Sequence, residues 1–442
     1  MLDIKLFRDQ ADLIKESEQK RFREVNNIDR VIQFDKEWRE SLQKVQDLRQ
    51  KRNSLTKDIS ECYKELKKAK SDEEKKKFEE KAEQLKLESK QVGIAIIEQE
   101  PKTKDLLFQR DEFRYRVGNI LDPKVPIAQD ETGNVIIRKW GRRKNFQFNI
   151  RNHVDLVEVI GGANVKKASE IAGNRFYYLQ NELVKLNLAL INFALDILIH
   201  EGYTPVWTPF FAKYEVIKEA AELGDFAEQL YKIEGEDLYL IATSEQTLAA
   251  LHRNEVIDEK QLPIRYAGVS SCFRREAGSH GKDTLGIFRV HQFEKVEQYV
   301  YCKPEDSAQM HEKMIMVTES IFKTLKIPYQ VVNIASGELN DNAAIKYDLE
   351  GWFPASNTYR ELVSATNCRD YQARKLNARF GTLGDPDTYE VVHTLNATAL
   401  ATERFICCLL ENNQNEDGSI TIPKALKPYM GGIESIPARK NP

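Results

Sequence analysis

The N-terminal part of the chain lacks the two residues that most strongly interrupt helices. Gly93 is the first glycine and Pro101 the first proline, so nothing before them breaks a very long helical stretch. Apolar residues recur there at spacings of three and four, about two in every seven, which is the pattern of a coiled-coil seam. One series covers residues 31–66 and a second covers 78–113. The pattern predicts two antiparallel helices, at about 29–70 and 73–116.

These helices would form an arm on the order of 60 Å long, at 1.5 Å of rise per residue. Ser71 supplies an N-cap for the second helix, and Asp72 and Glu73 supply acidic first-turn residues. Pro101 is expected to kink or interrupt this helix, because proline has no N–H to donate.

Lysines gather near the turn between the two helices: Lys64, Lys67, Lys68, Lys70, Lys75, Lys76 and Lys77. Acidic residues are interleaved with them. Charge alone therefore leaves three interpretations open, a dimerising coiled coil, a solvated stalk and a nucleic-acid-binding arm.

Composition excludes several classes of protein. The formal net charge is −3, so any nucleic-acid contact must come from a local patch. The cysteines form no C-x-x-C pair, which argues against a zinc ribbon and a disulfide scaffold, and no zinc is expected. The N-terminus has no apolar signal segment, and the most apolar stretch, 183–200, is interrupted by Lys185, Asn187, Asn192 and Asp196. We therefore expect a cytoplasmic protein with no membrane segment.

The chain changes character at residues 122–126, after which glycines and prolines become regular. Helical patterns occur at 181–201, 307–325 and 398–412, and strand patterns at 265–270, 288–297, 329–334 and 389–395. Helices and strands do not alternate regularly, so we predict an α+β fold with an antiparallel sheet flanked by helices. Two domains are expected, 1–121 with the helical arm (about 29–116) and 122–442 with the sheet.

Several common catalytic motifs are absent. The loop at 277–283 fails as a P-loop, because only two residues separate its glycines and Asp283 stands where a hydroxyl should bind Mg²⁺. No G-x-G-x-x-G follows a predicted strand, and G-x-S-x-G does not occur. Rossmann-type dinucleotide binding and serine-hydrolase chemistry are therefore unsupported.

Residues 272–297 form the densest polar constellation on apolar strands. Arg274 and Arg289 stand at the two stems of a strand–loop–strand, with Phe293 beside them. Arginine forks bind phosphates and carboxylates, and an aromatic face can stack on a purine. A nucleotide site and an ordinary surface hairpin with ion pairs both fit these charges.

Three segments resemble the class II aminoacyl-tRNA synthetases. Phe273-Arg274-Arg275-Glu276 followed by Arg289-x-x-x-Phe293 resembles motif 2 (about 272–297), and Gly202-Tyr203-Thr204-Pro205 after a long helix resembles motif 1 (about 181–211). Ala401-Thr402-Glu403-Arg404 resembles motif 3 (about 396–412). Within that class, Thr243-Ser244-Glu245, Glu361-Leu362-Val363-Ser364 and the helical arm are similar to the seryl-tRNA synthetase family, in its archaeal and cytosolic eukaryotic form.

The resemblance implies a homodimeric ligase that activates L-serine with ATP and passes it to the 3′ end of tRNA-Ser. It implies ATP contacts from Arg274, Arg275, Glu276, Arg289, Val290, His291, Gln292, Phe293, Glu361, Leu362, Val363, Ser364 and Arg404. It implies serine contacts from Thr243, Glu245, Arg274, Glu297, Asn396 and Thr398, and Mg²⁺ held through ATP by Glu361 and Ser364. Arg274, Arg289 and Arg404 would be catalytic, and the arm would read the long variable arm of the tRNA.

Two alternatives remain at this point: a synthetase-like paralogue with a binding or regulatory role, and a coiled-coil scaffold whose mixed domain is incidental.

Overall fold

The computed structural model describes residues 1–221, 228–276 and 285–439. The chain forms two compact units. The arm unit comprises Asp3–Gln19 with Arg23–Val117, and the sheet unit comprises Met1–Leu2, Lys20–Phe22 and Gly118–Pro442. The loop at 277–283 lies outside the described residues.

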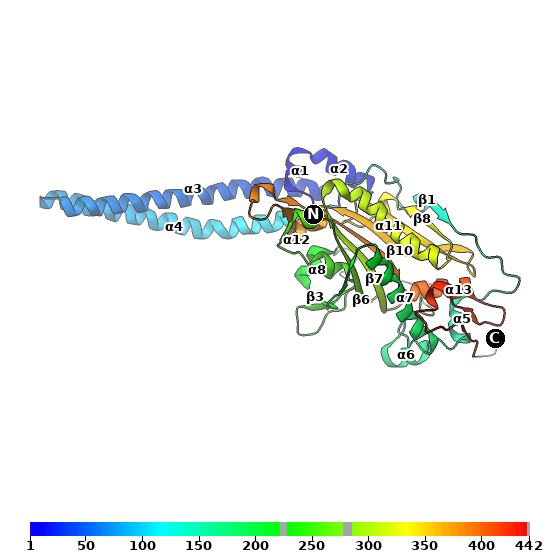
Figure 1. Ribbon diagram of the computed structural model, residues 1–442. Coiled ribbons are helices and arrows are strands. Elements are labelled where there is room, and N and C mark those ends of the chain that lie inside the picture. The colour runs from blue at the N-terminus through cyan, green and yellow to red at the C-terminus, as the bar shows by residue number, and fades with distance from the viewer. Residues whose placement is uncertain (222–227, 277–284, 440–442) are drawn as a thin grey trace. The chain divides into compact units, whose positions relative to one another are not determined.

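Where the structure describes the arm unit, its secondary-structure elements are all helices. Short helices α1 (Ile4–Asp9) and α2 (Ala11–Lys20) precede two long antiparallel helices, α3 (Asn26–Lys68) and α4 (Asp72–Arg114), which lie side by side (Figure 1). The Ser71 side chain accepts a hydrogen bond from the Glu74 N–H and so caps α4. The helical hairpin predicted from the sequence is confirmed, with ends displaced by one to three residues.

The two long helices meet in a narrow apolar seam, formed by Leu55, Val92 and Ile96 with Leu48 and Leu85 beside them. A polar contact continues it, because the hydroxyls of Ser41 and Thr103 lie 2.6 Å apart. The seam agrees with the two-in-seven apolar spacing of the sequence.

Helix α4 continues through Pro101, so the predicted interruption there is wrong. Pro101 and Ile97 are both solvent-exposed, Ile97 by 72%. The Ile97 carbonyl, which loses its N–H partner at position 101, can therefore bond to water instead.

An eight-stranded sheet organises the sheet unit, in the order β1-β8-β9-β10-β13-β7-β6-β2. The strands are β1 (Val135–Trp140), β2 (Thr204–Trp207), β6 (Ile264–Phe273), β7 (Gln292–Cys302), β8 (Tyr329–Asn333), β9 (Ile345–Phe353), β10 (Thr358–Arg369) and β13 (His393–Ala401). Neighbours in this sheet are antiparallel, except that β2 pairs with β6 in parallel. The predicted α+β class is confirmed.

Three helices pack on one face of this sheet and share its main core: α7 (Glu182–His200), α11 (Ser307–Thr324) and α13 (Thr402–Asn413) (Figure 1). We call this the helix face. The remaining helices are α5 (His153–Val159), α6 (Val165–Ala172), α8 (Tyr214–Ala220), α10 (Glu245–Ala249) and α12 (Tyr371–Leu376). Short strands complete the unit: β3 (Phe211–Lys213), β4 (Leu238–Leu240), β5 (Val256–Asp258), β11 (Arg379–Gly381), β12 (Glu390–Val391), β14 (Ile420–Thr421) and β15 (Ser435–Ile436).

Some predicted boundaries are wrong in the sheet unit. Strand β7 begins at Gln292, whereas 288–297 was expected, and Phe288 packs its ring in the core instead. Strand β13 extends to Ala401, so α13 begins four residues later than expected. Strands β9 and β10 were not predicted. The small residues before Thr402 have a helical pattern, but they pair with β10 and β7 and so belong to β13.

Helix α7 is long and apolar enough to cross a membrane by length and composition. Its apolar face explains that composition without lipid, because Leu183, Leu186, Leu190 and Leu198 are fully buried in the core of the sheet unit.

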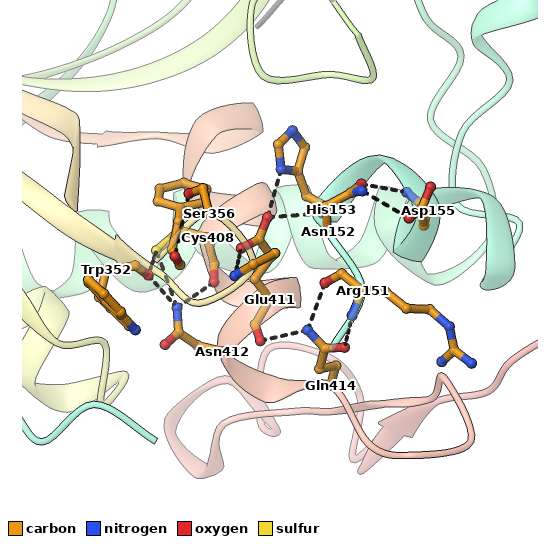
Figure 2. Close-up of polar contacts among 12 residues, drawn as sticks. Arg151, Asn152, His153, Asp155, Trp352, Ser356, Cys408, Glu411, Asn412 and Gln414 are labelled. Carbon is orange, nitrogen blue, oxygen red and sulfur yellow. Dashed lines mark hydrogen bonds and ion pairs between the residues drawn. The ribbon is translucent and has the colours of Figure 1, made fainter. Parts of the chain in front are cut away.

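A buried polar network ties α13 to α5 and β9 (Figure 2). The Glu411 carboxylate accepts from the backbone N–H of His153 and Ala355 and lies 2.9 Å from His153 Nδ1. Gln414, only 1% exposed, exchanges hydrogen bonds with the backbone of Arg151 and donates to the Glu411 carbonyl. The network fixes the C-terminal end of α13.

Candidate active site

The predicted site residues lie mainly on the sheet face opposite the helix face. Along β7 the side chains alternate: Gln298 donates to Met314 and Thr318 of α11 on the helix face. Phe293 and Glu297, at odd positions, therefore point to the other face. Cross-strand pairing of Glu297 with Thr398 brings β13 residues to the same side. We call this the site face.

Arg274 follows β6 directly and is held by its neighbours on several sides. Its backbone N–H donates to the His291 carbonyl (2.9 Å), and its carbonyl accepts from His291 Nδ1 (2.8 Å). Its Nε donates to the Ala242 carbonyl (3.3 Å), and its guanidinium lies 5.3 Å from the centre of the Phe293 ring. The cation is thus positioned before any ligand arrives.

The second stem of the hairpin brings Arg289 to Glu276, with 3.7 Å between Nη1 and Oε2. The Arg289 Nε is buried and has no hydrogen-bond partner among the described residues. Glu276 adopts a left-handed backbone, with φ of 49°, and its carbonyl accepts from Arg175. A buried N–H without an acceptor suits an anionic ligand.

Some members of the predicted ATP set do not present side chains to the site face. Val290, Leu362 and Val363 are buried in the main core, so they could contact a ligand only through their backbone. Arg275 is exposed, and its N–H donates to the Gln229 carbonyl. Gln292 lines a cavity on the helix face.

Acidic and basic groups converge around β9 and β10. The Glu361 carboxylate lies 3.9 Å from Arg404 and is half exposed. Loss of surrounding water raises the pKa of Glu361, but Arg404, Lys346 and two further arginines outweigh this and hold it below its ordinary value. Burial raises the pKa of Asp348 to about 7, although Lys346 opposes the shift from 3.7 Å.

These residues fit a divalent cation in part. Ser364 stands opposite Asp348 in the sheet, and Asp348 Oδ1 is buried with no hydrogen-bond partner among the described residues. The Glu361 carboxylate has a lowered pKa and is open to solvent. Such oxygens are the ligands that Mg²⁺ prefers. The described residues contain no cluster of three or more potential metal-ligating side chains, so nucleotide phosphates would have to supply further ligands.

A second, deeper group of polar side chains brings together the predicted serine contacts. Asn396 donates to Glu245 Oε1 (3.0 Å), Thr398 donates to Glu297 (3.2 Å), and the Glu245 N–H donates to Thr243 Oγ1 (3.2 Å). Burial and then the Glu297 charge raise the pKa of Glu245 to about 7. All these groups are more than nine-tenths buried apart from Glu245 itself, which is partly exposed. The pocket can pair with the polar groups of a small amino acid.

Arg404 and Phe293, both in the predicted ATP set, contact different partners here. The Arg404 guanidinium lies 5.3 Å from the centre of the Phe288 ring, while Phe293 faces Arg274. Arg360 lies over the Phe288 ring as well, at 3.8 Å.

Sequence reasoning missed Lys295, Lys346 and Asp348. Lys295 forms a 2.5 Å ion pair with Glu297 on β7. A signal existed for the other two, because polar residues alternate with apolar ones along I-K-Y-D-L-E, which is typical of a strand with one polar face.

A separate acidic pair lies on the helix face. Glu403 accepts from Tyr177 Oη (2.6 Å) and from the Glu294 N–H (3.1 Å). Burial, followed by the Glu294 charge, raises the pKa of Glu403 well above its ordinary value. Next to it lies a cavity of about 230 Å³, lined by Phe176, Tyr177, Leu179, Asn187, Gln292 and Glu294. This cavity is distinct from the site face.

The predicted tRNA-contacting lysines gather around the connection between α3 and α4, where all are exposed: Lys64, Lys67, Lys68, Lys70, Lys75, Lys76 and Lys77. Lys68 pairs with Glu65 at 2.8 Å, and Lys75 with Asp72 at 3.6 Å.

Comparisons with known families match both units. Residues 1–121 match the seryl-tRNA synthetase N-terminal domain, and residues 229–413 match the tRNA synthetase class II core domain (G, H, P, S and T). The serine–tRNA ligase of Methanosphaera stadtmanae is 56% identical, over 99% of this chain and all of the relative. The cytoplasmic serine–tRNA ligase of Arabidopsis thaliana is 44% identical, over 100% of this chain and 97% of the relative.

Two solved structures are similar over their whole length. Seryl-tRNA synthetase from Pyrococcus horikoshii, complexed with ATP, has a TM-score of 0.90 at 43% identity and covers 100% of both chains. The cytoplasmic serine–tRNA ligase from Naegleria fowleri, in complex with AMP, has a TM-score of 0.85 at 40% identity, covering 100% of this chain and 99% of that one.

Proposed function

The chain belongs to the seryl-tRNA synthetase family, and from this premise we propose how its residues share the work of a serine–tRNA ligase. In this reaction the serine carboxylate attacks the α-phosphorus of ATP and pyrophosphate leaves. The seryl group then passes to the 3′ end of tRNA-Ser and AMP leaves. One observation carries the proposal. On the site face, the fixed Arg274 cation lies beside a pocket of buried, hydrogen-bonded polar side chains. The chain that holds this arrangement is similar to serine–tRNA ligases over its full length.

Arg274, Arg289 and Arg404 stabilise the anionic reactants. Arg274 bridges the serine carboxylate and the α-phosphate, because it lies between the buried polar pocket and the hairpin stem. Preorganised charge of this kind acts on the transition state without further reorganisation. Arg289 binds the terminal phosphates, and Glu276 and Phe293 bind adenine.

Thr243, Glu245, Glu297, Asn396 and Thr398 recognise serine. They offer both acceptors and donors in a buried setting. An analogue without the hydroxyl would leave such groups unpaired, which is costly, so alanine should be rejected.

Glu361 and Ser364 hold Mg²⁺ together with ATP. The cation, when bound, neutralises phosphate charge. The low pKa of Glu361 supports this role, since it keeps the carboxylate ionised at neutral pH.

The remaining parts of the proposal concern the whole protein. Residues 1–121 form the tRNA-binding domain, whose coiled coil contacts the long variable arm of tRNA-Ser through the lysines at its tip. Residues 122–442 form the catalytic domain and a homodimer. The protein acts in the cytoplasm, as the name of the Arabidopsis relative states for that protein.

The test is serine-dependent ATP–pyrophosphate exchange, followed by charging of tRNA-Ser. We expect exchange with serine, and at least about 100-fold lower kcat/KM with alanine. A folded protein with no serine-dependent exchange would overturn the proposal and favour a binding or regulatory role.

A further inference from the structure

Gln372 lies directly behind the proposed serine pocket and is fully buried. It belongs to the short helix α12, and no sequence motif pointed to it. Its Nε2 donates to Glu245 Oε1 (3.2 Å) and to the Ala220 carbonyl, and its Oε1 accepts from Thr394 Oγ1 (3.0 Å) and Tyr299 Oη. All four hydrogen-bonding positions of the amide are therefore used.

These partners fix the orientation of the amide. The Ala220 carbonyl can only accept, so Nε2 must face it, and the same amide group then also faces Glu245. The two hydroxyls then donate to Oε1. Flipping the amide would place its oxygen against two acceptors in a buried site, which is costly.

Glu245 is consequently held from one side only. Its Oε1 accepts from both Gln372 and Asn396. Its Oε2 has no hydrogen-bond partner among the residues that the structure describes, which leaves this oxygen for a ligand.

We propose that Gln372 is a positioning residue for serine recognition, which orients the Glu245 carboxylate toward the substrate by donating to Oε1. The proposal rests on the proposed role of Glu245 in binding serine.

The charges around Glu245 show why a donor is needed. Burial and Glu297 raise its pKa to about 7, while Lys295, the Gln372 hydrogen bond and Arg274 lower it. The other titratable groups facing it, Tyr299 and Cys368, are neutral because their own pKa values are raised. Glu245 thus stands near its midpoint at neutral pH. Losing the Gln372 donor would raise the pKa further and neutralise the carboxylate.

The experiment uses the full-length variant Gln372→Met, which keeps side-chain volume and removes the hydrogen bonds. In serine-dependent pyrophosphate exchange, we expect the KM for serine to rise about tenfold or more, as for loss of a hydrogen bond to a charged group. The kcat and the KM for ATP should change less than about threefold. The acidic limb of kcat/KM for serine should move to higher pH, because Glu245 would then need a higher pH to ionise.

Gln414→Met is the matched control. Gln414 is also a buried glutamine with three hydrogen bonds (Figure 2), so its loss should lower stability without moving the KM for serine or the pH limb. If Gln372→Met behaves like this control, Gln372 is merely structural and the proposal is wrong.

Glu245→Gln separates the two levels of the argument. If it leaves the KM for serine unchanged, the proposed role of Glu245 fails. If it raises this KM but Gln372→Met does not, only the Gln372 proposal fails. In the Glu245→Gln background, Gln372→Met should cause no further shift of the pH limb, because the titrating group is gone.

Discussion

At the scale of residues, the pKa values of two glutamates in the site are shifted in opposite directions. Glu245 loses much of its contact with water and faces Glu297, so its pKa rises to about 7. Glu361 faces several cations, so its pKa falls despite the loss of surrounding water. The same kind of side chain is therefore only partly ionised at neutral pH in the proposed serine pocket and firmly ionised beside the proposed phosphate site.

The first prediction concerns Arg274. Arg274→Ala removes the cation that is fixed by Ala242 and His291 between the two proposed substrates. We expect serine-dependent pyrophosphate exchange to fall by about 100-fold or more, since one preorganised charge at such a position contributes about 3 kcal/mol. Circular dichroism and the unfolding midpoint serve as folding controls. Exchange within a few-fold of the wild-type rate would contradict the proposed mechanism.

The second prediction concerns Glu403, whose pKa is raised by burial and by Glu294. The folded state holds a proton that the unfolded state has lost, so stability is full below the ordinary carboxyl pKa and falls as pH rises toward the folded value. Glu403→Gln cannot lose this proton. Between pH 5 and pH 8, the wild-type free energy of unfolding should fall more steeply than that of the variant, by at most about 1.4 kcal/mol per pH unit. Parallel pH profiles in denaturant titrations would refute this.

Residue-level prediction could group residues that share a short motif. Arg274, Glu276 and Arg289 come from one strand–loop–strand, and a backbone hydrogen bond and an ion pair join its two stems. Gln372 could not be found in this way. It reaches Glu245 and Thr394 only because β13, α10 and α12 pack together. These elements are far apart in the sequence, so no local pattern predicts their contact.

At the scale of elements, long periodic helices were predictable and strands were less so. Helices α3 and α4 have a seam that repeats along their length, so their existence followed from local sequence. Strand β10 is held in place by pairing with β9 and β13. The mostly polar stretch at 358–369 carries too little apolar periodicity to predict this strand.

The third prediction concerns the arm. Deleting residues 48–97 and joining Asp47 to Glu98 through a short Gly-Ser loop leaves the contact between Ser41 and Thr103 in place, which should close the shortened hairpin. Serine-dependent exchange should stay near the wild-type rate, while the KM for tRNA-Ser in charging rises strongly. The measured quantity is the ratio of charging to exchange, before and after deletion.

Charge reversal at the arm tip provides a milder form of the same test. Lys67→Glu, Lys68→Glu, Lys75→Glu and Lys76→Glu together should raise the KM for tRNA and flatten its salt dependence, by roughly one unit of slope per lost phosphate contact. An unchanged ratio of charging to exchange in the deletion variant would mean that the arm does not carry the tRNA.

At the scale of the whole molecule, the sheet unit leaves a stripe of apolar side chains uncovered. Val184 and Leu188 on α7 are 42% and 55% exposed, and Trp207 on β2 is 76% exposed. The opposite side of α7 is already buried in the core. Helix α7 and strand β2 lie next to each other, and β2 is an edge strand of the sheet. Exposed apolar residues on neighbouring elements are typical of protein interfaces.

The last prediction follows from this stripe. In sedimentation at micromolar concentration, we expect a species near twice 51.1 kDa, both for the full chain and after deletion of residues 48–97, since α7 and β2 are outside the arm. Leu188→Lys combined with Trp207→Glu should shift the protein toward monomer, because a charge would have to be buried in the interface. Leu383→Lys, at a residue that is 58% exposed outside these elements, is the matched control and should sediment as wild type. A wild-type monomer, or a dimer that survives the double substitution, would show that this stripe does not hold two copies together.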